Sequence, residues 1–186
     1  MKQPRIGIYG GAFDPIHAGH LAVAETALLA GDFDEVWFVP TDTPPHKTSA
    51  TSARHRACMT QLAIMSRPRF KLNTIEFDLP KPSYSLRTVR VLQGQYPDLE
   101  FTLIIGLDEA LALHMWHNFR ELLRIVPIMI IGRSTYDWQE LDSNPVLLPF
   151  TKQLSRRVHL ESSVSSTTIR AQLVRGELAI DVPRNV

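Results

Sequence analysis

Two histidines three residues apart, His17 and His20, lie in the stretch GGAFDPIHAGH at residues 10–20. This stretch follows an apolar run at residues 6–9 and leads into an alanine-rich segment, which indicates a helix beginning near Ala18. The two glycines allow backbone N–H groups to approach an anion closely, and the helix would direct its positive end at the same place. On its spacing alone, the histidine pair also fits structural packing or half of a metal site. The strand, the glycine turn, the two histidines and the helix start together form a candidate phosphate-binding corner.

A second hydroxyl-rich stretch, VSSTTIRAQLVRGE at residues 164–177, has the pattern of a capped helix. Serines stand where an N-cap is expected, and Gly176 is a typical helix stop. Ile169 and Leu173 are four residues apart and would share one face of the helix. By itself this pattern predicts an ordinary helix, with Arg170 close to its start.

Two further polar stretches follow apolar runs. In the loop VPTDTPPHK, two prolines stiffen the chain and carry His46 and Lys47 outward. Both side chains could meet a phosphate group, although an exposed polar loop also explains them. The stretch PSYSLRT at residues 82–88 opens a helical pattern, and we expect Ser83 or Ser85 to cap its first turn.

Later apolar runs deliver more candidates to strand ends. The run at residues 101–105 ends at Gly106, which allows close backbone approach, and Asp108 is expected to cap the next helix. Trp116 is either a core aromatic or a surface on which a ligand ring stacks. The apolar strand PIMIIGR carries Arg133 to the same edge of the predicted sheet.

Apolar strand-like runs alternate with helical patterns and lie at residues 6–9, 36–39, 70–75, 101–105, 128–131 and 158–160. This alternation predicts a doubly wound, Rossmann-like α/β fold with a parallel sheet, in a single domain over residues 1–186. Binding sites in such sheets lie beyond the carboxyl ends of the strands. The least regular part, residues 134–155, is expected to be a surface excursion.

Composition excludes several classes of protein. The 186 residues include 20 basic and 19 acidic side chains, a net charge of +1, which gives no case for nucleic-acid binding. No stretch approaches about 18 uninterrupted apolar residues, and the first residues lack a signal-peptide pattern, so we expect a cytoplasmic protein without a membrane span. Cys58 lies among apolar residues on a helical pattern and is expected to be a buried, unreactive thiol.

The stretch at residues 10–20 resembles the GGxFDPxHxGH signature of bacterial nicotinate-nucleotide adenylyltransferases, and more distantly the HxGH corner of the nucleotidyltransferase superfamily. VSSTTIR resembles the second signature of that superfamily, ISSTxIR. The segments PPHK, PSYS and IIGLDEALALHMW resemble further family motifs, with Ser85 in place of a threonine and His114 in place of a proline. Arg56 matches a basic position in the family's helix after the PPHK loop. The resemblance spans nearly the whole chain.

The resemblance implies a role for each matching residue. The expected catalytic residues are His17, His20, Lys47 and Arg170. The expected ATP-binding residues are Gly10, Gly11, Phe13, His17, His20, Gly106, Asp108, Arg133, Ser165, Ser166, Thr167 and Arg170. The expected nicotinate-nucleotide-binding residues are Ala12, His46, Lys47, Ser83, Tyr84, Ser85, Trp116 and His117. No side chains are expected to form a metal site, and Mg²⁺ is expected on the triphosphate of ATP.

The implied reaction transfers AMP from ATP to nicotinate mononucleotide and gives deamido-NAD and pyrophosphate. One alternative is the same chemistry on nicotinamide mononucleotide, phosphopantetheine, or a sugar or polyol phosphate. Another is a nucleotide-binding module without catalysis. An aminoacyl-tRNA synthetase fragment is disfavoured because the chain has no KMSKS-like stretch. The expected partners are the two substrates, and self-association into a homo-oligomer stays open.

Overall fold

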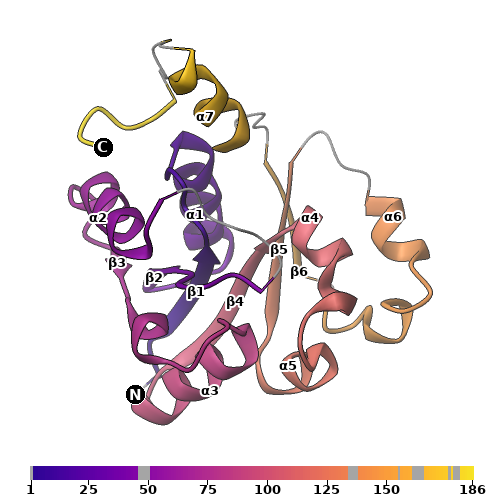
Figure 1. Cartoon of the computed structure of the whole chain (residues 1–186). Helices are drawn as coiled ribbons and strands as arrows, with labels where there is room; N and C mark the ends of the chain where they lie inside the picture. The colour runs from indigo at the N-terminus through magenta and orange to yellow at the C-terminus, as the bar shows by residue number, and fades with distance from the viewer. Residues whose placement is uncertain are drawn as a thin grey trace.

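A parallel sheet of six strands forms the centre of the computed structural model (Figure 1), which describes residues 2–45, 51–133, 138–154, 156–160, 166–175, 177 and 181–186. The strands are β1 (Arg5–Gly11), β2 (Glu35–Pro40), β3 (Phe70–Leu72), β4 (Glu100–Gly106), β5 (Ile128–Arg133) and β6 (Arg156–Leu160). Their order across the sheet is β3-β2-β1-β4-β5-β6, which is a doubly wound order. The predicted α/β fold is therefore confirmed.

All six predicted strand runs are confirmed, with one difference in length. The strand β3 ends at Leu72, although its apolar run continues to Ile75. The side-chain oxygen of Asn73 accepts the backbone N–H of Ile75 at 3.0 Å. An asparagine that bonds the backbone two residues further on favours a turn. The chain consequently leaves the sheet and forms the short 3₁₀ helix η1 (Ile75–Asp78).

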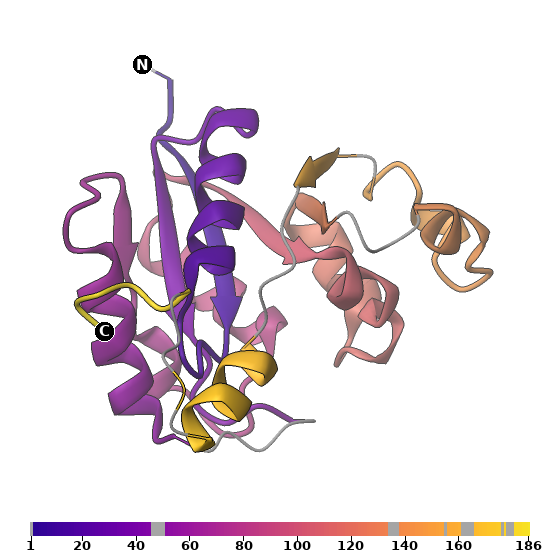
Figure 2. The ribbon, with the colours of Figure 1, turned by 90° about the horizontal axis from the view of Figure 1, so that it is seen from above.

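Helices cover both faces of the sheet. On one face lie α1 (Ala18–Ala30) and α2 (Ala53–Ile64), and on the other lie α3 (Ser85–Gln95), α4 (Leu107–Leu111), α5 (Phe119–Ile125) and α6 (Trp138–Ser143). Figure 2 shows α1 and α2 on one side of the molecule and α5 and α6 on the other. The last helix, α7 (Ser166–Val174), lies next to the start of α1 (Figure 1). Within the described part of the chain, no helix combines the length and apolar character that a membrane span requires.

The structure overturns two sequence predictions about burial. The described residues 138–154 are not only a surface excursion, because they form α6 and a 3₁₀ helix, η3 (Leu148–Phe150), and bury three leucines in the core, namely Leu141, Leu147 and Leu154. Cys58 is exposed rather than buried. The inward face of α2 instead carries Arg56 and Thr60 together with its small apolar residues. Because Arg56 is buried, the face of α2 that packs inward differs from the face that the apolar pattern predicts.

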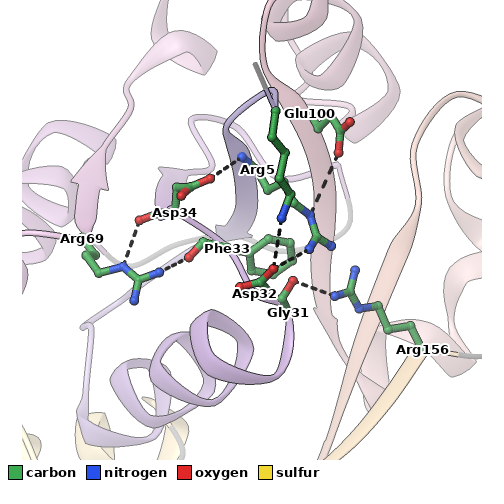
Figure 3. Close-up of polar contacts among 9 residues, drawn as sticks. Arg5, Gly31, Asp32, Phe33, Asp34, Arg69, Glu100 and Arg156 are labelled. Atoms are coloured by element: carbon green, nitrogen blue, oxygen red, sulfur yellow. Dashed lines mark hydrogen bonds and ion pairs between the residues drawn. The ribbon is translucent and has the colours of Figure 1, made fainter.

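Arginines hold together the edge of the sheet at which the strands begin (Figure 3). Arg5 donates to Asp32 at 3.2 Å, and Arg69 donates to the backbone oxygen of Phe33. The guanidinium groups of Arg5 and Arg156 lie 5.9 and 5.3 Å from the centre of the buried Phe33 ring. These contacts join β1, β6 and the turn after α1. This edge is therefore structural, and the opposite edge is left for binding.

Candidate active site

The carboxyl ends of β1 and β4 border a cavity of about 490 Å³. These strands are neighbours, and the helices that follow them, α1 and α4, pack on opposite faces of the sheet. Doubly wound sheets bind ligands in the crevice at such a switch point. Every predicted site residue whose side chain the structure describes lines this cavity, namely Gly10, Gly11, Ala12, Phe13, His17, His20, Ser83, Tyr84, Ser85, Gly106, Asp108, Trp116, His117, Ser166, Thr167 and Arg170.

Four other predicted site residues cannot be placed in the same way. His46, Lys47 and Ser165 lie outside the described residues. The backbone of Arg133 ends β5, and its side chain is outside the described part of the structure. Gly176, the expected helix stop, is outside it too. The roles of these residues stay predictions.

The two histidines form the start of α1, and the prediction of a helix beginning near Ala18 is confirmed. Their rings stack with centroids 3.7 Å apart, and His17 is almost fully buried. The Nδ1 atom of His20 accepts the backbone N–H of His17 at 3.2 Å. A neutral imidazole that accepts at Nδ1 carries its proton on Nε2. In this tautomer His20 carries its ring proton on Nε2, on the ring edge away from the cap, and the residue lines the cavity.

The helix α7 docks against the histidine corner from the far end of the chain. Ser166 Oγ donates to the backbone oxygen of Pro15 at 3.2 Å, and Arg170 Nη1 donates to that of Asp14 at 2.6 Å. Arg170 Nη2 also donates to Thr167 Oγ1 at 3.3 Å. These contacts bring the second hydroxyl-rich stretch to the same cavity as the histidines. The two stretches that sequence analysis singled out are thus neighbours in space.

The N-terminus of α3 forms another wall of the cavity. Its N-cap residue is Tyr84, and no side chain caps it, so the predicted cap by Ser83 or Ser85 is wrong. Ser83 Oγ instead accepts the backbone N–H of Thr43 at 3.2 Å and ties α3 to the loop after β2. The ring of Tyr84 stacks on that of His117 with centroids 4.3 Å apart. The first N–H groups of α3 have no partner within the helix and suit an acceptor outside it.

The end of β4 also differs from expectation. The N-cap of α4 is Gly106, without a side-chain cap, so the predicted cap by Asp108 is wrong. The carboxylate of Asp108 instead lies over Gly106, where any Cβ would collide with it. Trp116 is partly buried, packs against the core and also lines the cavity. Its stacking on a ligand ring stays a prediction.

A buried arginine holds the backbone around the corner. Arg56, which the family resemblance singles out, is only 1% exposed. Its guanidinium donates to the backbone oxygens of Ala12, of Thr41 at 2.6 Å and of Thr51 at 3.1 Å. Burial lowers the pKa of Arg56, and nearby carboxylates oppose that shift. Arg56 thus joins the turn after β1 to the loop after β2.

Replacing Arg56 by methionine is expected to lower the free energy of unfolding by about 1 to 3 kcal/mol, because buried carbonyl groups would lose their donors. Urea unfolding measures this change. Arg54→Met is the matched control, since Arg54 is exposed on the same helix and its loss should cost no more than about 0.5 kcal/mol. Equal losses in the two variants would contradict the structural role of Arg56.

Sequence analysis missed two buried carboxylates that line the cavity, Asp14 and Glu76. Glu76 accepts the hydroxyl of Thr88 at 2.8 Å and the backbone N–H of Asp42 at 3.3 Å. Burial raises the pKa of Glu76, and hydrogen bonds from Ser83, Thr88 and Asp42 oppose the shift. No local pattern marks this residue, because its partners lie 12 and 34 residues away.

Donors from both ends of the chain converge on the switch point of a doubly wound sheet, which is the arrangement of an α/β nucleotidyltransferase. Residues 8–172 match the cytidylyltransferase-like family. The chain belongs to this family and, within it, to the nicotinate-nucleotide adenylyltransferases, and it is an enzyme of the nucleotidyltransferase class.

Relatives in sequence and structure agree with this placement. A probable nicotinate-nucleotide adenylyltransferase of Oceanobacillus iheyensis is 47% identical over 135 residues, which cover 72% of this chain and 71% of that protein. The nicotinate-nucleotide adenylyltransferase of Bacillus subtilis is 41% identical over 134 residues, covering 71% of each chain. The structure of a nicotinic acid mononucleotide adenylyltransferase of Plasmodium falciparum, complexed with NaAD, superposes with a TM-score of 0.77 at 20% identity, over 96% of this chain and 88% of that one. That structural likeness concerns the fold.

Proposed function

We propose that this enzyme transfers the AMP part of ATP to nicotinate mononucleotide, which yields deamido-NAD and pyrophosphate as a step of NAD biosynthesis. The carrying observation is the cavity at the switch point, which has two walls of different chemistry. One wall is the histidine corner with α7, and the other is the N-terminus of α3 with Trp116 and His117. The activity named for the relatives supports this pair of substrates.

The histidine corner and α7 bind ATP in this proposal. The Nε2–H of His20 and the guanidinium of Arg170 are donors suited to phosphate oxygens, and hydrogen bonds from charged donors are the stronger ones. The turn at Gly10 and Gly11 lets backbone N–H groups approach the same phosphates. Lys47 is expected to add a further positive charge.

The acceptor needs no general base. Its phosphate is largely dianionic at pH 7, because the second pKa of a phosphate monoester is about 6. One of its oxygens attacks the α-phosphorus of ATP, and the bond from that phosphorus to the β-bridging oxygen breaks as pyrophosphate leaves. The protein contributes positioning and neutralisation of the charge that builds on the transferred and leaving phosphates. No covalent enzyme intermediate is required.

Mg²⁺ accompanies ATP in this proposal. Among the residues that the structure describes, no three histidine, cysteine, aspartate or glutamate side chains are grouped to hold an ion. Phosphate oxygens and water then supply most of the ligands, as Mg²⁺ usually prefers. Asp108 and Glu109, which line the cavity, are carboxylates that suit the water shell of such an ion. When bound, Mg²⁺ neutralises charge on the triphosphate.

The test is pyrophosphate release from ATP with a panel of acceptor phosphates. We expect release with nicotinate mononucleotide and little with phosphopantetheine or sugar phosphates. ATP binding without release on any acceptor would instead support the nucleotide-binding module. Faster release with another acceptor would retain the chemistry and overturn the substrate.

Replacing Arg170 by alanine is expected to raise the KM for ATP about tenfold and to change the KM for nicotinate mononucleotide much less, because one charge-assisted contact to the triphosphate is lost. Steady-state kinetics measure both constants. Arg175→Ala is the matched control, since Arg175 follows the same helix and pairs with Glu177. Equal weakening of both substrates, or unfolding at room temperature, counts against the assignment of Arg170.

A further inference from the structure

We propose that Glu76 is a positioning residue for the acceptor subsite. Its buried carboxylate holds the N-terminus of α3, whose N–H groups receive the carboxylate of the nicotinate ring. This inference deepens the proposed function and rests on it. Its contribution is to the placement of the acceptor rather than to the binding of ATP.

Glu76 joins three parts of the acceptor wall. It lies in η1, is 7% exposed and lines the cavity. The hydroxyl of Thr88, in the first turns of α3, donates to Oε1 at 2.8 Å. The backbone N–H of Asp42, in the loop after β2, donates to Oε2 at 3.3 Å.

Backbone N–H groups are the donors that the start of α3 presents, and Ser83 holds this helix start in place. Its Oγ accepts the N–H of Thr43, and its own N–H donates to the oxygen of Thr43 at 2.9 Å. These two hydrogen bonds fix the residue before the N-cap of α3 to the loop after β2. The intrahelical bonds of α3 begin where the N–H groups of Arg87 and Thr88 reach the oxygen of Tyr84. The N–H groups before them are helix-end donors, which favour an anion.

The loop after β2 is held at Asp42, whose backbone N–H and backbone oxygen both form hydrogen bonds to side chains. Glu76 accepts the N–H of Asp42, and Arg56 donates to the oxygen of Asp42 at 3.3 Å. Arg56 reaches from there to Ala12 in the turn after β1. The acceptor wall is therefore fixed relative to the phosphate-binding corner through Glu76 and Arg56. A shift of α3 would move its N–H groups away from the acceptor and leave the ATP wall in place.

Burial of a carboxylate is costly, and an apolar group of similar volume often makes a protein more stable. Burial raises the pKa of Glu76, in keeping with that cost. Stability alone therefore does not account for a glutamate here. The two carboxylate oxygens of Glu76 accept hydrogen bonds from two different segments, α3 and the loop after β2. A glutamate at this position therefore fixes the distance between these segments.

The experiment compares Glu76→Gln and Thr88→Val with the wild-type enzyme, using steady-state kinetics with ATP and with both pyridine mononucleotides. In Glu76→Gln, the NH₂ group of the new amide would face a hydrogen-bond donor, either the Thr88 hydroxyl or the Asp42 N–H. In Thr88→Val, valine keeps the shape of threonine but lacks its hydroxyl. We expect the KM for nicotinate mononucleotide to rise about tenfold in Glu76→Gln, and the KM for ATP to stay within about twofold. The preference for the nicotinate over the nicotinamide acceptor should fall as well. Thr88→Val should show the same split to a smaller extent.

Glu35→Gln is the matched control, because the Glu35 carboxylate likewise accepts a side-chain hydrogen bond, from Trp37 at 2.8 Å, but lies outside the cavity. An unchanged acceptor KM in Glu76→Gln, or equal changes for both substrates, would overturn the inference. If Glu76→Gln does not fold, Thr88→Val decides in the same way. A wild-type enzyme that releases no pyrophosphate with nicotinate mononucleotide would instead overturn the proposed function.

Discussion

The variant His20→Ala is expected to lower kcat about 10²- to 10³-fold with a modest change in the KM for ATP, because one preorganised donor to the developing phosphate charge is removed. The Nδ1 atom of His20 accepts the N–H of His17, so Nε2 carries the proton that the phosphates need. The interaction strengthens as charge builds on the transferred and leaving phosphates. A donor of this kind lowers the barrier more than it strengthens substrate binding.

Two further variants separate catalysis from helix capping. His20→Asn retains a side-chain oxygen that can accept the N–H of His17, so its kcat should stay low while its thermal stability recovers. His55→Ala removes an exposed histidine from α2 and should leave kcat unchanged. An alanine variant at position 20 with a kcat within about threefold of wild type would show that the ring is structural, since a catalytic donor contributes far more.

The wild-type enzyme is expected to use nicotinate mononucleotide with a kcat/KM at least about 10²-fold above that for nicotinamide mononucleotide. A carboxylate only accepts hydrogen bonds, whereas an amide presents two N–H donors and no charge. At the start of α3 the amide would place donor against donor, in a cavity that the partly buried indole of Trp116 also lines. Two unpaired contacts at roughly 1 to 3 kcal/mol each account for this factor.

The kcat/KM values of Ser85→Ala for the two mononucleotides test whether backbone N–H groups or the Ser85 hydroxyl cause the preference for nicotinate mononucleotide. Ser85 is the first residue of α3, and its side chain makes no cap. If the backbone N–H groups are the donors, the ratio of kcat/KM values should change by no more than about twofold, as for a substitution away from the critical contacts. Comparable kcat/KM values for the two mononucleotides in the wild-type enzyme would refute the specificity while leaving adenylyl transfer intact.

Local sequence determined the elements and the corner of this protein. A glycine pair after an apolar run, followed by a small-residue segment, specifies a strand, a turn and a helix within about twenty residues, where local preferences decide. The parallel arrangement of the strands followed from their alternation with helices. The candidate site residues were predicted from the family motifs that they match, and these motifs stand mostly at strand ends, which a parallel sheet brings to one edge. The cytoplasmic location and the state of association stay predictions.

Helix caps were predicted less well, because a capping side chain has other acceptors and donors to choose from in the folded chain. Ser83 binds Thr43, forty residues away, instead of capping α3. Asp108 folds over Gly106 instead of capping α4. Sequence shows that such a side chain can cap a helix, and only the packed neighbours decide whether it does.

The tertiary structure alone decided the roles of Arg56 and Glu76. In a helical pattern an arginine predicts an exposed face, yet Arg56 is buried because the turn after β1, 44 residues away, directs a backbone oxygen at it. Glu76 follows a strand and has no local signature, and its carboxylate is satisfied by groups from α3 and from the loop after β2. A buried polar group is stable only where distant segments supply its partners. Those partners exist only once the sheet has brought the segments together, so such residues cannot be predicted from their own neighbours in sequence.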